Sequence, residues 1–337
     1  MASLKDVAKL AGVSVATASR VLNDSATVSD EKRESVLSAI QKLDYRPNLA
    51  ASSLRAKDSK IIGLLIPGRT HITFGMNTSY IADACNESGY SLLIALHHDD
   101  PELESKMLDS FFRRNIDGII ISTNSEESTI LKQIESYHIP VVVIDRVLQS
   151  DKFNCASIDN YKAGYMAGSY LASLGHKRIG CLTKPLTIWQ CYQRVQGFKQ
   201  ALKDNNVDVV DRYIVEVPDF SFEAGVLGTE KLLRCEAGDM PTALWAVEDT
   251  IAAGAIRAIV SAGFRVPRDI SVMGMDNLDV SHYLSPSLTT ITYPFRQISN
   301  VAVQCILDHC TNQNTRTRQF VFAPELVIRQ STAAPRE

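Results

Sequence analysis

From Lys60 onward, short runs rich in β-branched residues alternate with longer amphipathic stretches, and no other feature of the sequence restricts the fold as strongly. The short runs have the length of buried strands, and the longer stretches have helical spacing of their apolar residues. This alternation is typical of parallel sheets whose strands are joined by right-handed crossovers. A segment of about 270 residues is too long for one sheet, so the sequence predicts a two-lobed α/β domain with two doubly wound parallel sheets. The predicted strands are 61–67, 92–96, 118–122, 141–145, 155–159, 178–183, 243–247 and 270–275, and the predicted helices are 101–114, 161–174, 189–204, 222–235 and 249–262.

The first 45 residues contain no such runs and predict an all-α domain of three helices. The first helix covers 4–11 and stops at Gly12, and the second covers 15–23 with Ser14 as its N-cap. A third helix, capped by Asp30, follows a polar turn. Its expected apolar face consists of Val36, Leu37, Ile40 and Leu43.

Small apolar residues around Gly12 allow the first two helices to cross closely, as a helix-turn-helix requires. The second helix would then present its outer face to the major groove of DNA. Arg20 can make two hydrogen bonds to guanine, while Val15 and Ala16 can contact thymine methyl groups. Spacing alone leaves a second interpretation open, in which the three helices form a plain bundle that contacts other proteins.

The charge is unevenly distributed along the chain. The net charge of the 337 residues is -3, yet 1–57 hold nine Lys/Arg against six Asp/Glu. A basic head on an acidic body suits a polyanion-binding module attached to a sensor. No apolar run approaches the roughly 20 residues that span a bilayer. The first residues also lack the basic-then-apolar pattern of a signal peptide, so we expect a cytoplasmic protein with no membrane partner.

Enzyme, metal and cofactor motifs are missing from the sequence. It contains no Gly-x-Gly-x-x-Gly, Walker loop, Gly-x-Ser-x-Gly or His-Glu-x-x-His pattern. The seven cysteines are scattered without a Cys-x-x-Cys pair, which predicts reduced thiols. The only cluster of histidines, at 97–98, is most simply explained as the end of a strand. We therefore expect no catalytic residues, no metal site and no cofactor.

Three segments near the N-terminus carry a specific resemblance: LKDVAKLAGVS at 4–14, TASRVLN at 17–23 and YRPN at 45–48. Together they resemble the lactose-repressor (LacI/GalR) family of transcriptional regulators. Weaker landmarks of that family continue through most of the chain, among them GHKRIG at 175–180 and ELVIR at 325–329. The resemblance implies a helix-turn-helix domain at 1–46, a hinge helix and linker at 47–59, and a two-lobed, periplasmic-binding-protein-like domain for effector binding and dimerisation at 60–337.

The resemblance also implies how the head would contact double-stranded operator DNA. Val15, Ala16 and Arg20 would read bases from the major groove, and serine and asparagine side chains would contact phosphates. The 48–55 segment matches the hinge helix, whose leucine wedges into the minor groove and bends the duplex. Ser52 departs from the family by replacing a frequent arginine. The complete set of expected DNA contacts is Ser3, Ser14, Val15, Ala16, Ser19, Arg20, Asn23, Ser29, Asn48, Ala51, Leu54 and Arg55.

Several charged side chains lie at the ends of predicted strands, where doubly wound sheets form their ligand clefts. Asp159, Glu248 and Asp276 each end or follow a strand, and Arg194 lies in the helix after 178–183. Such groups can make charge-assisted hydrogen bonds to a polyhydroxyl ligand. Structural interpretations remain open, because Asp159 and Asp276 could be helix N-caps and Arg194 could form a surface ion pair.

By resemblance, these four residues match effector-binding positions, and Phe74, Phe220 and Phe295 match positions in the walls of the cleft. Trp189 and Gln190 begin the same helix as Arg194 and could add a stacking face and an amide. Glu248 departs from the family, in which asparagine is common at this position. A sugar or sugar derivative is the expected effector, with a nucleoside or purine as the alternative.

The predicted function is that of a ligand-responsive transcriptional repressor that binds a palindromic operator as a homodimer. Effector binding would change how the lobes close, and hence the folding of the hinge and the affinity for DNA. The sequence leaves open whether the ligand is an inducer or a corepressor. A small-molecule-binding protein without a DNA role is the rival class, which would not need the helix-turn-helix. The tail after Arg329 has no leucine heptads, so we expect no coiled-coil tetramer.

Overall fold

The computed structural model describes residues 2–22, 28–45, 59–68, 72–124, 127–148, 152–235, 239–311 and 316–336. The chain divides into two compact units, Met1–Ser59 and Lys60–Glu337. Among the described residues, no helix combines the length and apolar character needed to cross a membrane.

The first unit contains α1 (Leu4–Leu10), α2 (Val15–Leu22) and α3 (Asp30–Lys42). The predicted cap of α2 is confirmed, because the Thr17 backbone N–H donates to Ser14 Oγ over 3.1 Å. Gly12 has a φ of +67°, which lets the chain turn tightly between α1 and α2. The core of this unit consists of Val7, Ala8, Ala18, Val21, Val36 and Ala39.

Two details of the third helix were predicted wrongly. Leu37 is 53% exposed, whereas its neighbour Val36 is fully buried. Because a helix turns by about 100° per residue, the burial of Val36 and Ala39 places Leu37 at the edge of the inner face. The N-cap position is Ser29 rather than Asp30, which is the first helical residue.

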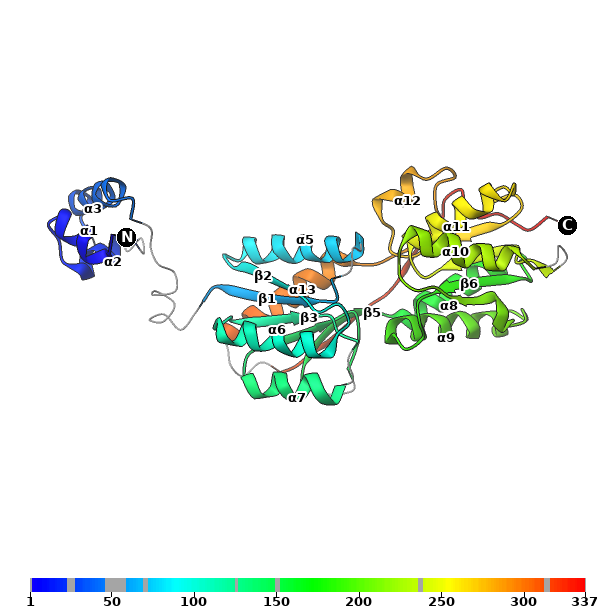
Figure 1. The fold of residues 1–337 in the computed structure, drawn as a ribbon, viewed down its shortest axis with the longest axis horizontal. Coiled ribbons are helices and arrows are strands. Elements are labelled where there is room, and N and C mark those ends of the chain that lie inside the picture. The colour runs from blue at the N-terminus through cyan, green and yellow to red at the C-terminus, as the bar shows by residue number, and fades with distance from the viewer. Residues whose placement is uncertain are drawn as a thin grey trace. The chain divides into compact units, whose positions relative to one another are not determined.

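The second unit begins with a six-stranded parallel sheet that forms the first lobe (Figure 1). Helices α5 (Ile72–Glu87) and α13 (Phe295–Thr311) cover one face of this sheet, and α6 (Pro101–Arg113) and α7 (Glu127–Tyr137) cover the other. The strand order is β11 (Gln319–Phe322), β5 (Asn154–Ile158), β4 (Val141–Ile144), β3 (Gly118–Ile121), β1 (Ile61–Ile66) and β2 (Ser91–Leu96).

The second lobe contains a four-stranded parallel sheet. Helices α8 (Asn160–Ser173) and α9 (Trp189–Asp204) cover one face, and α10 (Phe222–Leu233) and α11 (Asp249–Ser261) cover the other (Figure 1). The strand order is β7 (Ile214–Glu216), β6 (Ile179–Thr183), β8 (Ala243–Ala246) and β9 (Ser271–Met273). The predicted two-lobed α/β fold with doubly wound parallel sheets is therefore confirmed.

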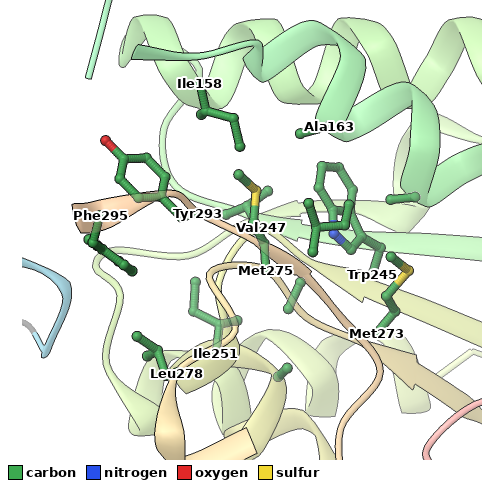
Figure 2. Close-up of a cluster of buried hydrophobic side chains, with 14 of the residues drawn as sticks. Ile158, Ala163, Trp245, Val247, Ile251, Met273, Met275, Leu278, Tyr293 and Phe295 are labelled. Carbon is green, nitrogen blue, oxygen red and sulfur yellow. The ribbon is translucent and has the colours of Figure 1, made fainter. Parts of the chain in front are cut away.

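The chain passes between the lobes three times. It leaves the first lobe after β5, returns between β10 (Thr290–Thr292) and α13, and leaves again between β11 and β12 (Glu325–Val327). Strands β10 and β12 pair antiparallel in the second lobe, a pairing that the sequence pattern did not predict. Apolar side chains at these passages join the main core, where Ile158 and Tyr293 lie in the same cluster as Val247 and Met275 (Figure 2).

A buried histidine connects the second lobe to the C-terminal segment. His176 is 1% exposed, and its Nε2 donates to the Ala333 carbonyl over 2.9 Å while Nδ1 lies 2.9 Å from the Thr242 hydroxyl. Burial is the main reason why the pKa of His176 lies below its usual value of 6.5. The folded protein therefore binds fewer protons at this site than the unfolded chain does.

This linkage predicts the direction of a pH effect. The stabilising contribution of neutral His176 is fully present above the unfolded-state pKa and is lost as the pH falls through the lower folded-state pKa. We expect the wild type to lose more free energy of unfolding than His176→Gln when the pH is lowered from about 7.5 to about 5. Urea denaturation at both pH values measures this difference, and equal losses in the two proteins would contradict it.

Candidate functional site

A cavity of about 320 Å³ lies between the two lobes of the second unit, at the carboxyl ends of their strands. Both lobes contribute side chains, as expected for a ligand site in doubly wound sheets. Of the residues predicted from the sequence, Phe74, Gln190, Arg194, Phe220, Glu248, Asp276 and Phe295 line this cavity.

Arg194 is a cation of the cavity wall that hydrogen bonds hold in place. It lies on α9, is 7% exposed, and donates from Nε to Asn160 Oδ1 over 2.8 Å and from Nη1 to the Val247 carbonyl over 2.9 Å. These bonds hold the guanidinium plane at the ends of β5 and β8. A guanidinium fixed in this way can bind a ligand oxygen with little further loss of side-chain entropy.

Glu248 brings a deeply buried carboxyl group to the cavity. It is 1% exposed and immediately precedes α11. Loss of hydration raises its pKa well above the usual value, the nearby Asp249 raises it further, and the charges of Arg194 and Lys184 oppose this shift. A carboxyl group in this environment can exchange hydrogen bonds with hydroxyl groups of a ligand.

Asp276 follows β9 and reaches the cavity from an unusual backbone conformation. Its φ is +105° and that of Asn277 is +55°. Positive φ values in residues other than glycine cost about 1–3 kcal/mol and are maintained where the surroundings hold them. The Asp276 N–H donates to the Ile291 carbonyl over 2.7 Å, which ties this residue to β10. The interpretation of Asp276 as a helix N-cap has no support here, because Leu278 occupies the cap position of α12 (Asp279–Tyr283).

Asp145 is a cavity residue that the sequence analysis did not select. It follows β4 and accepts hydrogen bonds from Ser122 Oγ over 2.5 Å and from the Tyr293 hydroxyl. Burial and the adjacent carboxylate raise the pKa of Tyr293 well above its usual value, so Tyr293 remains a hydrogen-bond donor. The position of Asp145 at the end of a predicted strand was a usable signal, of the same kind that identified Asp276.

Aromatic rings form part of the wall. Tyr293 and Phe295 have ring centroids 4.5 Å apart, and Lys184 Nζ lies 4.3 Å from the centroid of Phe220. Phe74 enters from α5 of the first lobe. Rings of this kind can pack against the apolar face of a sugar or a base.

Three amide oxygens in the cavity wall have no hydrogen-bond partner among the described residues. They are Oδ1 of Asn77 on α5, Oδ1 of Asn124 after β3 and Oε1 of Gln190 on α9, and all three atoms are buried. Buried polar atoms are nearly always hydrogen-bonded, so such acceptors in opposite walls of one cavity are well suited to donors on a ligand. Asn77 escaped the sequence analysis because an asparagine in a helix has no distinctive pattern.

Asp159 and Trp189 do not line the cavity. The Asp159 side chain caps α8 by accepting from the Lys162 N–H over 2.8 Å, and Trp189 begins α9 with a half-buried side chain. The sequence left open the alternative that Asp159 is a helix N-cap, and the structure confirms this alternative.

The predicted base-reading residues lie on one exposed face of the helix-turn-helix. Val15, Ala16 and Arg20 of α2 are exposed, as is Ser14, while Ser19 is half-buried. Ser3 is the exposed N-cap of α1, with its N–H and Oγ donating to Asp6, and Ser29 is exposed before α3. The remaining predicted contacts, Asn23, Asn48, Ala51, Leu54 and Arg55, lie outside the residues that the structure describes.

Comparisons with known proteins find family matches in both units. Residues 3–48 match the family model of bacterial regulatory proteins of the lacI family, and residues 169–332 match a periplasmic binding protein-like domain. The HTH-type transcriptional repressor PurR of Klebsiella pneumoniae (strain 342) is 36% identical over 335 residues, which cover 99% of this chain and 97% of the relative. The ribose operon repressor of Haemophilus influenzae is 35% identical over 336 residues, which cover 98% of each protein.

Solved structures give the same result. The lac repressor dimer bound to operator and the anti-inducer ONPF matches with a TM-score of 0.88 and 28% identity, covering 99% of both chains. A LacI-family regulator from Enterococcus faecium with bound ribose matches with a TM-score of 0.73 and 26% identity, covering 81% of this chain and 99% of that one. The helix-turn-helix head, the two-lobed body and the extent of these similarities lead to one conclusion: this chain belongs to the lacI family of bacterial regulatory proteins.

Proposed function

We propose that this chain is a ligand-responsive transcriptional repressor that binds a palindromic operator as a homodimer, and that its cleft binds a sugar or sugar derivative. The observation that carries the effector class is the pair of buried amide oxygens of Asn77 and Gln190 in opposite walls of one cavity. A polyhydroxyl ligand supplies donors to such acceptors and can also accept from Arg194. The aromatic wall would pack against the apolar face of the ring.

The relatives support this choice of ligand. One solved relative contains bound ribose, and one curated relative is a ribose operon repressor. A nucleoside contains both a sugar and a base, so it remains the alternative outcome of the test. A regulator that binds chromosomal operators would act in the cytoplasm.

The two lobes provide a mechanism for regulation. A ligand held by Asn77 on one lobe and by Arg194 on the other stabilises the conformation in which both groups reach it. Coupling of about 1–3 kcal/mol between this conformation and DNA binding would change operator affinity by roughly 5- to 150-fold. Whether the ligand raises or lowers that affinity is decided by which conformation binds the operator.

Ligand screening by calorimetry tests the effector class. The panel contains pentoses, hexoses, disaccharides, nucleosides and purine bases, each titrated into the full-length protein. We expect saturable binding of a sugar and a matching change in operator affinity. Binding of a nucleoside or base alone would replace the sugar with the alternative, and binding without any effect on DNA would contradict the regulatory role.

Selection of bound sequences from random DNA duplexes tests the DNA-binding residues. The wild type is expected to enrich a palindrome whose half-sites are one helical turn apart. Arg20→Ala should cost about 1–3 kcal/mol at one base position of each half-site and relax specificity there. Ser19→Ala, at a predicted phosphate contact, should weaken binding to all sequences about equally. A uniform loss for Arg20→Ala would argue against its role as a base reader.

A further inference from the structure

The backbone of the 274–278 segment is strained, and the residues that line the cavity do not account for how this strain is maintained. Asp276 and Asn277 are consecutive residues with positive φ, and Asp276 carries its carboxylate to the cavity. Residues other than glycine rarely adopt such a backbone conformation unless neighbouring groups hold it in place. Groups packed behind this segment supply that support.

Asp249, the first residue of α11, lies directly behind it. This side chain is fully buried and does not line the cavity. Its Oδ2 accepts from the Leu278 N–H over 2.7 Å, and its backbone N–H donates to the Met275 carbonyl over 2.7 Å. The two bonds fasten the segment on either side of Asp276.

Thr290 on β10 completes the arrangement. Its hydroxyl donates to Asp249 Oδ1 over 2.6 Å and accepts from the Asn277 N–H over 3.3 Å. The same oxygen of Asp249 would lie only 2.2 Å from a Cβ at position 274, so the approach of this carboxyl group requires Gly274. Burial and the nearby Asp276 both raise the pKa of Asp249, which is consistent with the closeness of the two carboxyl groups.

We propose that Asp249 is a positioning residue for effector binding, which fixes the backbone of Asp276 through the hydrogen bonds that its carboxyl group accepts from Leu278 and Thr290. This inference rests on the proposed function, because it requires Asp276 to contact the effector. Asp249 itself does not line the cavity. Its hydrogen bonds hold the loop before the ligand arrives, so that binding does not have to provide the energy of ordering it.

Three variants of the full-length protein separate positioning from other effects. Asp249→Ala removes both acceptors and is expected to weaken sugar binding by about 10-fold or more. Asp249→Asn keeps an oxygen for the Leu278 N–H and should recover most of that loss, whereas equal losses in the two variants would indicate an effect of charge and overturn the proposal. In Asp276→Ala, further replacement of Asp249 by alanine should add little, because the group that it positions is gone.

A matched control separates positioning from general destabilisation. Ser271→Ala removes a fully buried hydroxyl of β9 that exchanges two 3.0 Å hydrogen bonds with the Ala333 backbone, away from the cavity. We expect this variant to lower the melting temperature while keeping wild-type sugar affinity. If it weakens binding as much as Asp249→Ala does, the positioning role is wrong.

A structural measurement keeps this proposal separate from the proposed function. Crystal structures of the ligand-free wild type and Asp249→Ala should show Asp276 leaving its positive φ in the variant only. If the wild type binds nothing in the ligand panel, the proposed function fails, and this comparison still decides whether Asp249 holds the segment. An unchanged Asp276 backbone in the variant would overturn the proposal whatever the ligand result.

Discussion

Replacing Gly164 with alanine is expected to lower the free energy of unfolding of the second unit by about 3 kcal/mol. A Cβ at this position of α8 would lie 1.8 Å from the backbone oxygen of Arg194 on α9. The contact is reciprocal, because a Cβ at Gly197 of α9 would lie 1.9 Å from the backbone oxygen of Tyr161 on α8. Since both neighbours are backbone atoms, the clash can be relieved only by moving the helices apart. Urea denaturation measures the loss.

The same displacement should also weaken effector binding, because it moves the helix that carries Arg194 away from Asn160 and Val247. Gly75→Ala is the matched control, since a Cβ there would meet nothing within 4 Å and Gly75 lies within α5. Alanine in a helix is favoured over glycine by about 0.8–1.0 kcal/mol, so this variant should be as stable as the wild type or more so. Equal stability of both variants would mean that α8 and α9 are not in such close contact.

Arg194→Met is expected to weaken effector binding by on the order of 100-fold. The substitution removes the fixed guanidinium and leaves Asn160 Oδ1 and the Val247 carbonyl without the donor that they have now. Operator affinity in the absence of ligand should change far less, because Arg194 does not belong to the unit that contains the predicted DNA contacts. Calorimetry with the sugar that the wild type binds, and fluorescence anisotropy with labelled operator, measure the two affinities.

Arg257→Met serves as the control for Arg194→Met. Arg257 lies on α11, in the same lobe, and its side chain is exposed and does not line the cavity. It should bind the effector as the wild type does. If Arg194→Met retained wild-type affinity for the sugar, the effector would have to bind without this guanidinium and the proposed site would be wrong.

Local patterns in the sequence determined the class of the protein. The small residues around Gly12 and the exposed face of α2 are properties of adjacent residues, so they can be recognised without a structure. The alternation of strands and helices is also local, because a buried parallel strand is apolar along its whole length. Residues at strand ends, such as Glu248 and Asp276, could be selected because parallel strands direct their carboxyl ends to one edge of the sheet.

Tertiary structure decided which of these residues meet and what supports them. Asp159 and Asp276 both follow strands, yet the first caps the next helix, α8, and the second reaches the cavity from strained backbone. Asn77 and Tyr293 enter the cavity from segments about 200 residues apart, and the three-residue strands β10 and β12 pair across an intervening helix. The hydrogen bonds of Asp249 likewise join three elements. Contacts of this kind leave no periodic pattern in the chain, because they depend on how distant segments pack rather than on the order of neighbouring residues.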